Sequence, residues 1–193
     1  MKTDIILSGV GGQGILSIAT IIGEAATHSG LYLKQAEVHG MSQRGGDVQS
    51  NLRLSDSPIA SDLIAQGTAD MILSLEPMEA LRYLPYLDRE GWIITSSAPF
   101  KNIPNYPDEQ ALKEELTQLP HIILVDVEQI AHEHNMPKCA NVILLGAASR
   151  YLGIVSVDEL RDSIARVFGS KGSAVVEMNQ KAFDLGYAAA ENK

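Results

Sequence analysis

The sequence predicts an α/β fold of three layers, in which helices cover both faces of a mixed, mostly parallel sheet and the C-terminal third is helical. Three observations lead to this prediction. Short apolar runs alternate with helical or turn-like stretches along the chain. The first run passes through a glycine-rich turn into a helical pattern, which is typical of the first strand of a parallel sheet. The last third carries helical patterns alone.

The N-terminal elements follow directly from these patterns. The run 5–7 is short and uniformly apolar, so it predicts a strand that is buried on both faces. Residues 12–29 place apolar side chains at helical spacing, and Gly30 supplies the stop signal. A second strand is expected over 32–38.

A third strand is expected over 47–54, half exposed because apolar and polar residues alternate along it. After the turn signal at 55–58 a return strand would run antiparallel, which is why the sheet is predicted to be mixed. A capping box, Ser156-Val157-Asp158-Glu159, opens one of the C-terminal helices. The other expected elements are strands at 71–75, 91–96 and 121–125, a proline-rich loop at 96–107, and helices at 141–151, 157–168 and 173–190.

Composition limits the class of protein. The 193 residues are expected to form a single domain, residues 1–193, because no repeat, low-complexity tract or shift of composition divides the chain. A net charge of −9 without a basic cluster argues against nucleic acid and against acidic membrane surfaces as partners. No stretch approaches the roughly 20 apolar residues of a membrane span. With one cysteine and no export signal, the expected location is cytoplasmic.

The glycine-rich turn Gly9-Val10-Gly11-Gly12-Gln13-Gly14 is the first candidate ligand site. At such a junction of strand and helix, backbone N–H groups and the positive end of the helix can receive an anion. Gly9, Gly11 and Gly14 match the G-x-G-x-x-G spacing of dinucleotide-binding folds, and Glu37 is placed to bind a ribose hydroxyl. A tight turn requires glycine even without a nucleotide, so binding of NAD or FAD is one of two interpretations.

A second glycine motif, Ser42-Gln43-Arg44-Gly45-Gly46, follows about thirty residues later. Glycine lets the backbone approach closely, so Arg44 is expected to reach a phosphate or carboxylate held over the first turn. The alternative is an arginine in a surface loop or a subunit contact. His39 is a candidate acid or base, although a structural or solvent-facing histidine is the commoner case.

The remaining polar candidates give weaker signals. Glu76 and Asp126 each follow an apolar strand, so both are expected at the carboxyl edge of the sheet beside the glycine turn, with helix caps as the alternative. His132 and His134 do not predict a metal site, because residues two apart on a helix point to different faces. Cys139 is the single cysteine, so the chain has no ligand set for an iron–sulfur cluster. No catalytic residue is assigned, because the sequence shows no recognisable pattern of a nucleophile with a partner base.

Three segments together resemble the gamma-type domain of the 2-oxoacid:ferredoxin oxidoreductases. They are Val10-Gly11-Gly12-Gln13-Gly14, then Glu37-Val38-His39-Gly40-Met41-Ser42-Gln43-Arg44-Gly45-Gly46, and Asn141-Val142-Ile143-Leu144-Leu145-Gly146-Ala147. The resemblance spans almost the entire chain. The sequence from His39 to Gly46 is most similar to the indolepyruvate branch, in which such a domain forms the small beta subunit.

The resemblance implies that the cofactors are bound by other subunits and not by this chain. In that family thiamine diphosphate, magnesium and the iron–sulfur clusters belong to other domains, which in the indolepyruvate branch form a large alpha subunit. Coenzyme A is the co-substrate and ferredoxin the electron acceptor. This chain would then hold no cofactor and would be inactive alone. The residues agree, because oxidative decarboxylation needs an electron sink and a route for single electrons, and the sequence offers ligands for neither.

Because the glycine turn and Arg44 suit a phosphate-bearing ligand, this chain is expected either to help hold coenzyme A or to close over the shared active site. Ferredoxins are commonly acidic, so the charge of −9 favours their docking on the alpha subunit rather than on this chain. Two alternatives stay open. One is a stand-alone NAD(P)-dependent oxidoreductase, and the other is a purely structural subunit that binds no small molecule.

Overall fold

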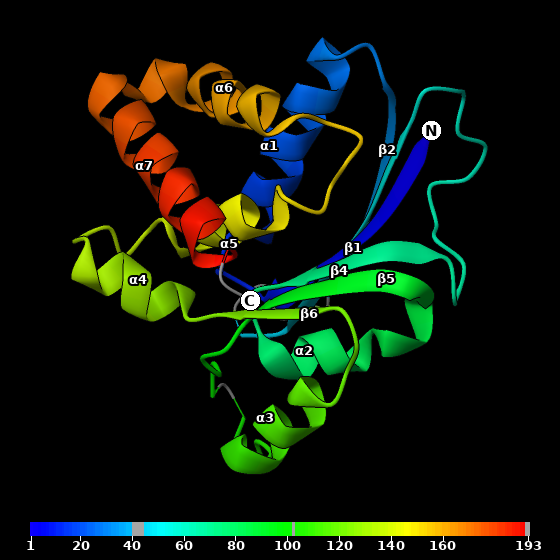
Figure 1. The fold of residues 1–193 in the computed structure, drawn as a ribbon, viewed down its shortest axis with the longest axis vertical. Helices are drawn as coiled ribbons and strands as arrows, with labels where there is room; N and C mark the ends of the chain where they lie inside the picture. Colours follow the sequence, from blue (N-terminus) through cyan, green and yellow to red (C-terminus); the bar gives the residue numbers. More distant parts are fainter. Residues whose placement is uncertain (40–44, 102, 192–193) are drawn as a thin grey trace.

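One mixed sheet runs through the middle of the molecule, with helices on both of its faces (Figure 1). The computed structural model describes residues 1–39, 45–101 and 103–191. The strands in this part of the chain are β1 Lys2–Val10, β2 Tyr32–His39, β3 Asp47–Ser55, β4 Ala69–Ser74, β5 Leu87–Ser96 and β6 Ile122–Val125. The helices are α1 Ile15–His28, α2 Pro77–Arg82, α3 Glu109–Thr117, α4 Val127–Glu133, α5 Ala140–Ala148, α6 Val157–Phe168 and α7 Ser173–Ala189, with short 3-10 turns η1 Leu84–Tyr86 and η2 Gly169–Lys171. The predicted α/β class and the helical C-terminal third are confirmed.

A single strand accounts for the mixed character of the sheet, whose order is β2-β3-β1-β4-β5-β6. β3 pairs antiparallel with both β1 and β2, whereas β4 pairs in parallel with β1 and with β5, and β5 pairs in parallel with β6. β4, the strand that follows the turn at 55–58, runs opposite to β3 as predicted. β4 does not pair with β3, however. β4 lies on one side of β1, and β3 lies on the other side, between β1 and β2.

The prediction that the third strand is half exposed is wrong for the second half of β3. Ser50, Asn51 and Leu52 are at most 3% exposed. Helix α1 contacts β3, and the loop 56–68 closes over it where the Ile64 N–H donates to the side-chain oxygen of Asn51 at 3.1 Å. An inner strand of this sheet is covered on both faces, so the alternation of polar and apolar residues did not report exposure.

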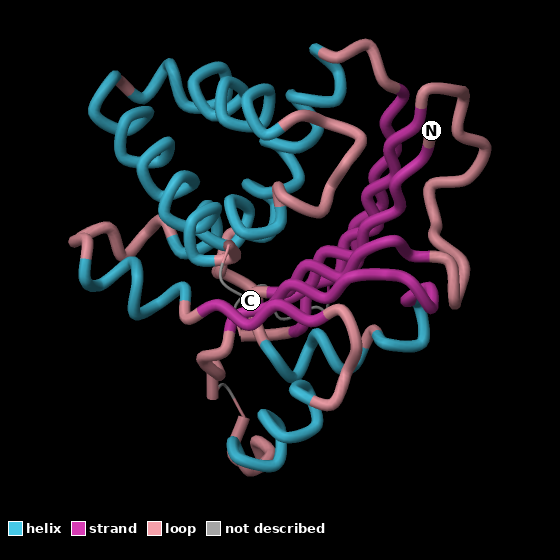
Figure 2. The backbone as a smooth tube through the Cα atoms, in the orientation of Figure 1, coloured by secondary structure: helices cyan, strands magenta, loops and turns pink. Residues whose placement is uncertain are grey.

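The two faces of the sheet carry cores of unequal size. Successive residues of a strand point to opposite faces. Ile5 and Leu7 of β1 belong to the larger core, which they share with α1, α5, α6 and α7. Ile6 points the other way, into a smaller core with Ala80 of α2, and α3 packs against α2. Figure 2 shows the helices on both sides of the magenta sheet.

Helices α5 and α7 are in backbone contact. A Cβ atom added at Gly146 would lie 2.0 Å from the carbonyl oxygen of Phe183, and one at Gly186 would lie 1.8 Å from that of Ile143. Both positions therefore require glycine for close approach. This contact helps to set the position of α5, whose first turn contacts the N-cap of α1.

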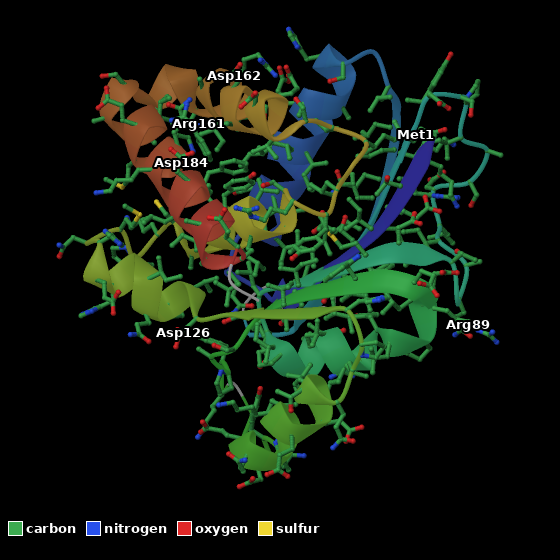
Figure 3. All side chains as sticks on the ribbon, in the orientation of Figure 1. Met1, Arg89, Asp126, Arg161, Asp162 and Asp184 are labelled. Atoms are coloured by element: carbon green, nitrogen blue, oxygen red, sulfur yellow. The ribbon has the colours of Figure 1, made fainter. Side chains whose placement is uncertain are left out.

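The other predicted features of the C-terminal half are also present. The Ser156 hydroxyl accepts the N–H of Glu159 at 3.1 Å, as the capping box predicts. Arg161 of α6 donates to both carboxylate oxygens of Asp184 of α7, at 2.9 and 3.1 Å, and Figure 3 labels the two side chains next to each other. The described residues of the predicted loop 96–107 form neither helix nor strand, except that Ser96 still belongs to β5. Among the helices that the structure describes, none has both the length and the apolar character of a membrane span.

Candidate functional site

The glycine-rich turn joins the end of β1 to the start of α1, as predicted. Gly12 has a φ of 103° and Gly14 a φ of 88°, which is the left-handed region that favours glycine. Gly14 is the N-cap of α1 and supplies no capping side chain, and the first turn of the helix carries no acidic residue. The positive end of a 14-residue helix is thus left without a counter-charge of its own.

Four backbone N–H groups at this turn have no acceptor among the described residues. They belong to Gly12, Gly14, Ile15 and Leu16. Free N–H groups at the start of a helix normally bind a capping side chain, water or a ligand. Because they lie at the positive end of α1, they offer donors that suit an anion such as a phosphate.

The two glycine motifs meet, as their pairing in the sequence predicted. The N–H of Gly11 donates to the carbonyl oxygen of Gly46 at 2.8 Å, and the N–H of Gly45 donates to that of Gly11 at 3.4 Å. Ser42, Gln43 and Arg44 lie outside the described residues, as does the side chain of His39. The roles of these residues therefore stay predictions.

Gln13 connects the turn to the neighbouring strand. Its Oε1 accepts the N–H of Val10 at 2.7 Å, and its Nε2 donates to the carbonyl oxygen of Leu75, just after β4, at 3.2 Å. A Cβ atom on Gly9 would lie 2.8 Å from Gln13 Oε1, so Gly9 makes room for this side chain. Both residues shape the turn, and contact of either with a ligand stays a prediction.

Asn141 is a site residue that sequence reasoning missed. It lies in the first turn of α5, and its Nδ2 donates to the carbonyl oxygen of Gly14 at 3.1 Å. A Cβ atom on Gly14 would be 2.6 Å from the same nitrogen. The first turns of α1 and α5 are therefore locked together. The only signal in the sequence was that Asn141 is the first residue of one of the three segments that carry the family resemblance. No sequence pattern linked it to Gly14.

Two pockets flank the turn, and Gly11, Gly12 and Gly14 line both. The first, the Glu37 pocket, has a volume of about 340 Å³ and is otherwise lined by Val10, Ile15, Leu16, Glu37 and Val48. The second, the Lys138 pocket, has a volume of about 520 Å³ and is otherwise lined by Gln13, Ser17, Leu75, Phe100, Glu128, Pro137, Lys138, Ala140 and Asn141. Both volumes lie within the range of small-molecule sites.

The two pockets differ in charge and polarity. Among the described residues, the side chains that line the Glu37 pocket are apolar except for the exposed carboxylate of Glu37, and the N–H groups of Gly12, Gly14, Ile15 and Leu16 belong to its lining. The Lys138 pocket carries the hydroxyl of Ser17, the ammonium group of Lys138 and the carboxylate of Glu128. Lys138 is exposed and forms no ion pair with any described residue.

Glu76 follows β4 at the carboxyl edge of the sheet, as predicted, and the structure gives it the role of a helix cap. Its carboxylate is fully buried and accepts the N–H of Glu79 at 3.0 Å, which caps α2. It also accepts the N–H of Phe100 at 3.4 Å and the hydroxyl of Tyr106. Burial, and then the hydrogen bond to Glu76, raise the pKa of Tyr106 above its ordinary value. Glu76 lines neither pocket.

Asp126 likewise caps a helix, because its Oδ1 accepts the N–H of Gln129 at 2.9 Å at the start of α4. For both acids the alternative reading as caps is confirmed. Cys139 is buried, and burial raises the pKa of its thiol, which disfavours the reactive thiolate. Within the described ranges, no three His, Cys, Asp or Glu side chains are grouped so as to hold a metal ion.

Comparisons with known proteins identify the family of the chain. Residues 4–189 match the pyruvate ferredoxin/flavodoxin oxidoreductase family. The indolepyruvate oxidoreductase subunit IorB of Pyrococcus horikoshii is 36% identical, over 97% of this chain and 96% of that protein. The gamma subunit of a keto/oxoacid ferredoxin oxidoreductase from Geobacter sulfurreducens is 26% identical with a TM-score of 0.69, over 97% of this chain and 98% of that one.

A larger protein shows the same fold. The 2-oxoglutarate:ferredoxin oxidoreductase of Magnetococcus marinus, solved with 2-oxoglutarate, coenzyme A and succinyl-CoA bound, has a TM-score of 0.77 at 22% identity. All of this chain aligns, but only 31% of that one. The resemblance found in the glycine motifs is thereby confirmed, and the chain belongs to the pyruvate ferredoxin/flavodoxin oxidoreductase family, as a small subunit similar to IorB.

Proposed function

We propose that this chain is the small subunit of an indolepyruvate:ferredoxin oxidoreductase and that it binds coenzyme A at the glycine turn. The observation that carries the proposal is the set of four N–H groups at the positive end of α1 that have no acceptor in the described part of the chain, between two pockets of ligand size. The names of the IorB relatives support the branch, and the coenzyme A in the Magnetococcus enzyme supports the ligand.

The proposed reaction converts a 2-oxo acid, coenzyme A and two oxidised ferredoxins into an acyl-CoA, carbon dioxide, two reduced ferredoxins and a proton. Thiamine diphosphate, magnesium and iron–sulfur clusters would supply the electron chemistry from the large alpha subunit. Cys139, the single cysteine in the sequence, is buried, so this chain does not fit an iron–sulfur cluster. A single reduced cysteine also suits a cytoplasmic location.

The contribution of this chain is to bind and orient coenzyme A. The N–H groups of Gly12, Gly14, Ile15 and Leu16 would donate to its diphosphate oxygens, and the packing of Asn141 on Gly14 would keep these donors in place before the ligand arrives. Arg44 would add a charge-assisted contact, a role that depends on the sequence alone.

Binding of a dinucleotide is a second candidate function, favoured by the presence of Glu37 beside the glycine turn. The sheet order argues against it. In dinucleotide-binding folds the strand that carries the acidic residue is adjacent to the first strand. Here β3 lies between them, which moves Glu37 away by one strand spacing, about 4.8 Å.

The proposal is tested on the enzyme assembled from this chain and its large partner. We expect reduction of ferredoxin that requires both an aryl 2-oxo acid and coenzyme A, and none with either subunit alone. Arg44→Ala should raise the KM for coenzyme A about tenfold, the loss of one charge-assisted contact. The matched control is Arg89→Ala, an exposed arginine on β5 far from the turn (Figure 3).

Three results would count against the proposal. An unchanged KM and turnover in Arg44→Ala would remove Arg44 from the coenzyme A site. Micromolar binding of NADH by this chain alone would favour the dinucleotide alternative. A preference for pyruvate or 2-oxoglutarate over indolepyruvate would assign the enzyme to another branch.

A further inference from the structure

The sheet ends in an apolar edge strand at β6. β6 is the last strand of the described sheet and pairs with β5, while β2 forms the opposite edge (Figure 1). The sequence of β6, Ile122–Val125, is apolar throughout and carries neither a charge nor a proline. Edge strands usually carry such residues, because an apolar edge without them pairs with other chains. β2 follows this rule, since Lys34 and Glu37 lie on it.

Two residues of β6 turn their backbone polar groups away from the sheet. The carbonyl oxygens of His121 and Val125 each accept an N–H from the side of β5, at 2.9 Å. Alternate residues of a parallel strand bond to the same neighbouring strand. The N–H and C=O groups of Ile122 and Leu124 therefore point outward, where they have no partner among the described residues.

A groove with a volume of about 520 Å³, the β6 groove, lies beside this edge on the face that carries α3. Leu112 and Leu116 of α3, Leu124 of β6 and Pro99 are among its apolar lining residues. Successive side chains of a strand point to opposite faces, so every second residue of a strand added to β6 would face this groove. Extended peptides bind to sheets in this way, through main-chain hydrogen bonds along an edge and a pocket for alternate side chains.

The charge of the β6 groove favours a basic segment. Its lining contains the carboxylates of Asp108, Glu109 and Asp126 against one ammonium group, that of Lys113. Glu109 pairs with Lys101, whereas Asp108 and Asp126 take part in no ion pair within the described ranges. Two copies of this chain joined at β6 would bring these acids together, so a partner with positive charge is favoured over a second copy.

We propose that an extended segment of the large subunit adds to β6 as a further strand of the sheet. Its backbone pairs with Ile122 and Leu124, an apolar side chain enters the β6 groove, and a neighbouring lysine or arginine pairs with Asp108 and Asp126. The β6 groove shares no lining residue with the two pockets at the glycine turn, so this docking site is separate from the proposed ligand site. The inference rests on the proposed function, which supplies the partner.

Hydrogen exchange of the backbone amides tests the pairing directly. The full chain is exchanged alone and in the enzyme assembled with the large subunit, and each amide is followed by NMR. Ile122 and Leu124 should exchange at least about tenfold more slowly in the complex, because their N–H groups gain an acceptor. Ile123 and Val125 are the matched controls, since their N–H groups face β5 and should be protected in both states.

The double variant Asp108→Asn, Asp126→Asn tests the charge. Asparagine caps a helix as well as aspartate does, so the caps of α3 and α4 are retained and the chain should fold. The variant should raise the dissociation constant for the large subunit about tenfold, measured by biolayer interferometry, and less at high salt. The matched control is Asp158→Asn with Asp162→Asn, two exposed acids of α6, which lies far from Asp126 (Figure 3). It should leave the constant within about twofold of the wild type.

The outcomes separate this inference from the proposed function. If the subunits assemble but Ile122 and Leu124 exchange as fast as in the free chain, the large subunit docks elsewhere and the inference is wrong. The same conclusion follows if the double variant at Asp108 and Asp126 binds as tightly as the wild type. Protection of the two amides in the free chain that grows with its concentration would assign the edge to a second copy and also overturn the inference. If the two subunits do not assemble at all, the proposed function itself fails.

Discussion

The two ends of β1 differ in how completely their polar groups are paired. At the carboxyl end, four N–H groups of the glycine turn and the start of α1 have no acceptor among the described residues. At the amino end, the fully buried carboxylate of Asp4 accepts from Arg53 Nε at 2.8 Å and Nη2 at 2.9 Å, and from Lys2 at 2.8 Å. The polar groups at the amino end of β1 are thus paired by ion pairs, whereas those at its carboxyl end have no partner among the described residues.

This difference distinguishes the end of the strand that stabilises the fold from the end where we propose that a ligand binds. Arg53 also donates to the carbonyl oxygens of Ser61 and Leu63, which attaches the loop 56–68 to the sheet. Burial by itself would raise the pKa of Asp4, but the hydrogen bonds from Arg53 and Lys2 outweigh it and lower that pKa below its usual value. The N–H groups at the opposite end have no such partner within residues 1–39, 45–101 and 103–191, which is expected where a ligand completes the pairing.

The largest expected effect on stability comes from removing the ion pair between Asp4 and Arg53 at the amino end of β1. Asp4→Asn leaves the Arg53 guanidinium, whose side chain is only 17% exposed, without its counter-charge. We expect a loss of about 3 kcal/mol in the free energy of unfolding, measured by urea denaturation. Asp62→Asn, which removes an exposed ion pair with Lys34, is the control and should cost less than about 1 kcal/mol. Equal losses would show that burial of Asp4 is unimportant.

A smaller effect on stability is expected at Gly14, which packs against Asn141 of α5. Gly14→Ala must adopt a positive φ and bring its Cβ within 2.6 Å of Asn141 Nδ2, so it should cost about 2 kcal/mol. In a double-mutant cycle with Asn141→Ala, part of that loss should be recovered because the contact is removed. Strict additivity of the two substitutions would contradict the locking of the two helix starts.

Gly12→Ala should cost less than Gly14→Ala. A Cβ atom at Gly12 meets nothing within 4 Å, so only its positive φ of 103° is penalised, by about 1 kcal/mol. The same methyl group would stand between the two pockets and should weaken coenzyme A binding more than tenfold by calorimetry. Unaltered binding would place the ligand elsewhere.

The smallest effect concerns pH. Because the pKa of Asp4 is lower in the folded chain than its value of 3.8 in model compounds, its contribution to stability is present above that pH and is lost as the pH falls further. The effect is limited, since burial opposes the hydrogen bonds that lower the pKa. The difference in urea midpoint between wild type and Asp4→Asn should therefore shrink below pH 3.8. A difference that stays constant would show that Asp4 does not titrate in this way.

Much of the fold and the first half of the site were predictable from local patterns. The strand, glycine turn and helix at the N-terminus are encoded within residues 5–29, and the capping box at Ser156 within four residues. Such elements depend on neighbours in the chain, so periodicity and turn residues suffice to place them. The family resemblance was equally legible, because it consists of short runs of consecutive residues.

Only the tertiary structure decided the strand order and the lining of the pockets. No local pattern shows that β3 inserts between β1 and β2, which buries Ser50 and Asn51 and displaces Glu37. The contact between Asn141 and Gly14 joins residues 127 positions apart. The sequence by itself thus determined which segments form a turn that can receive an anion. The side chains around that turn come from distant segments, and long-range packing alone brings them together.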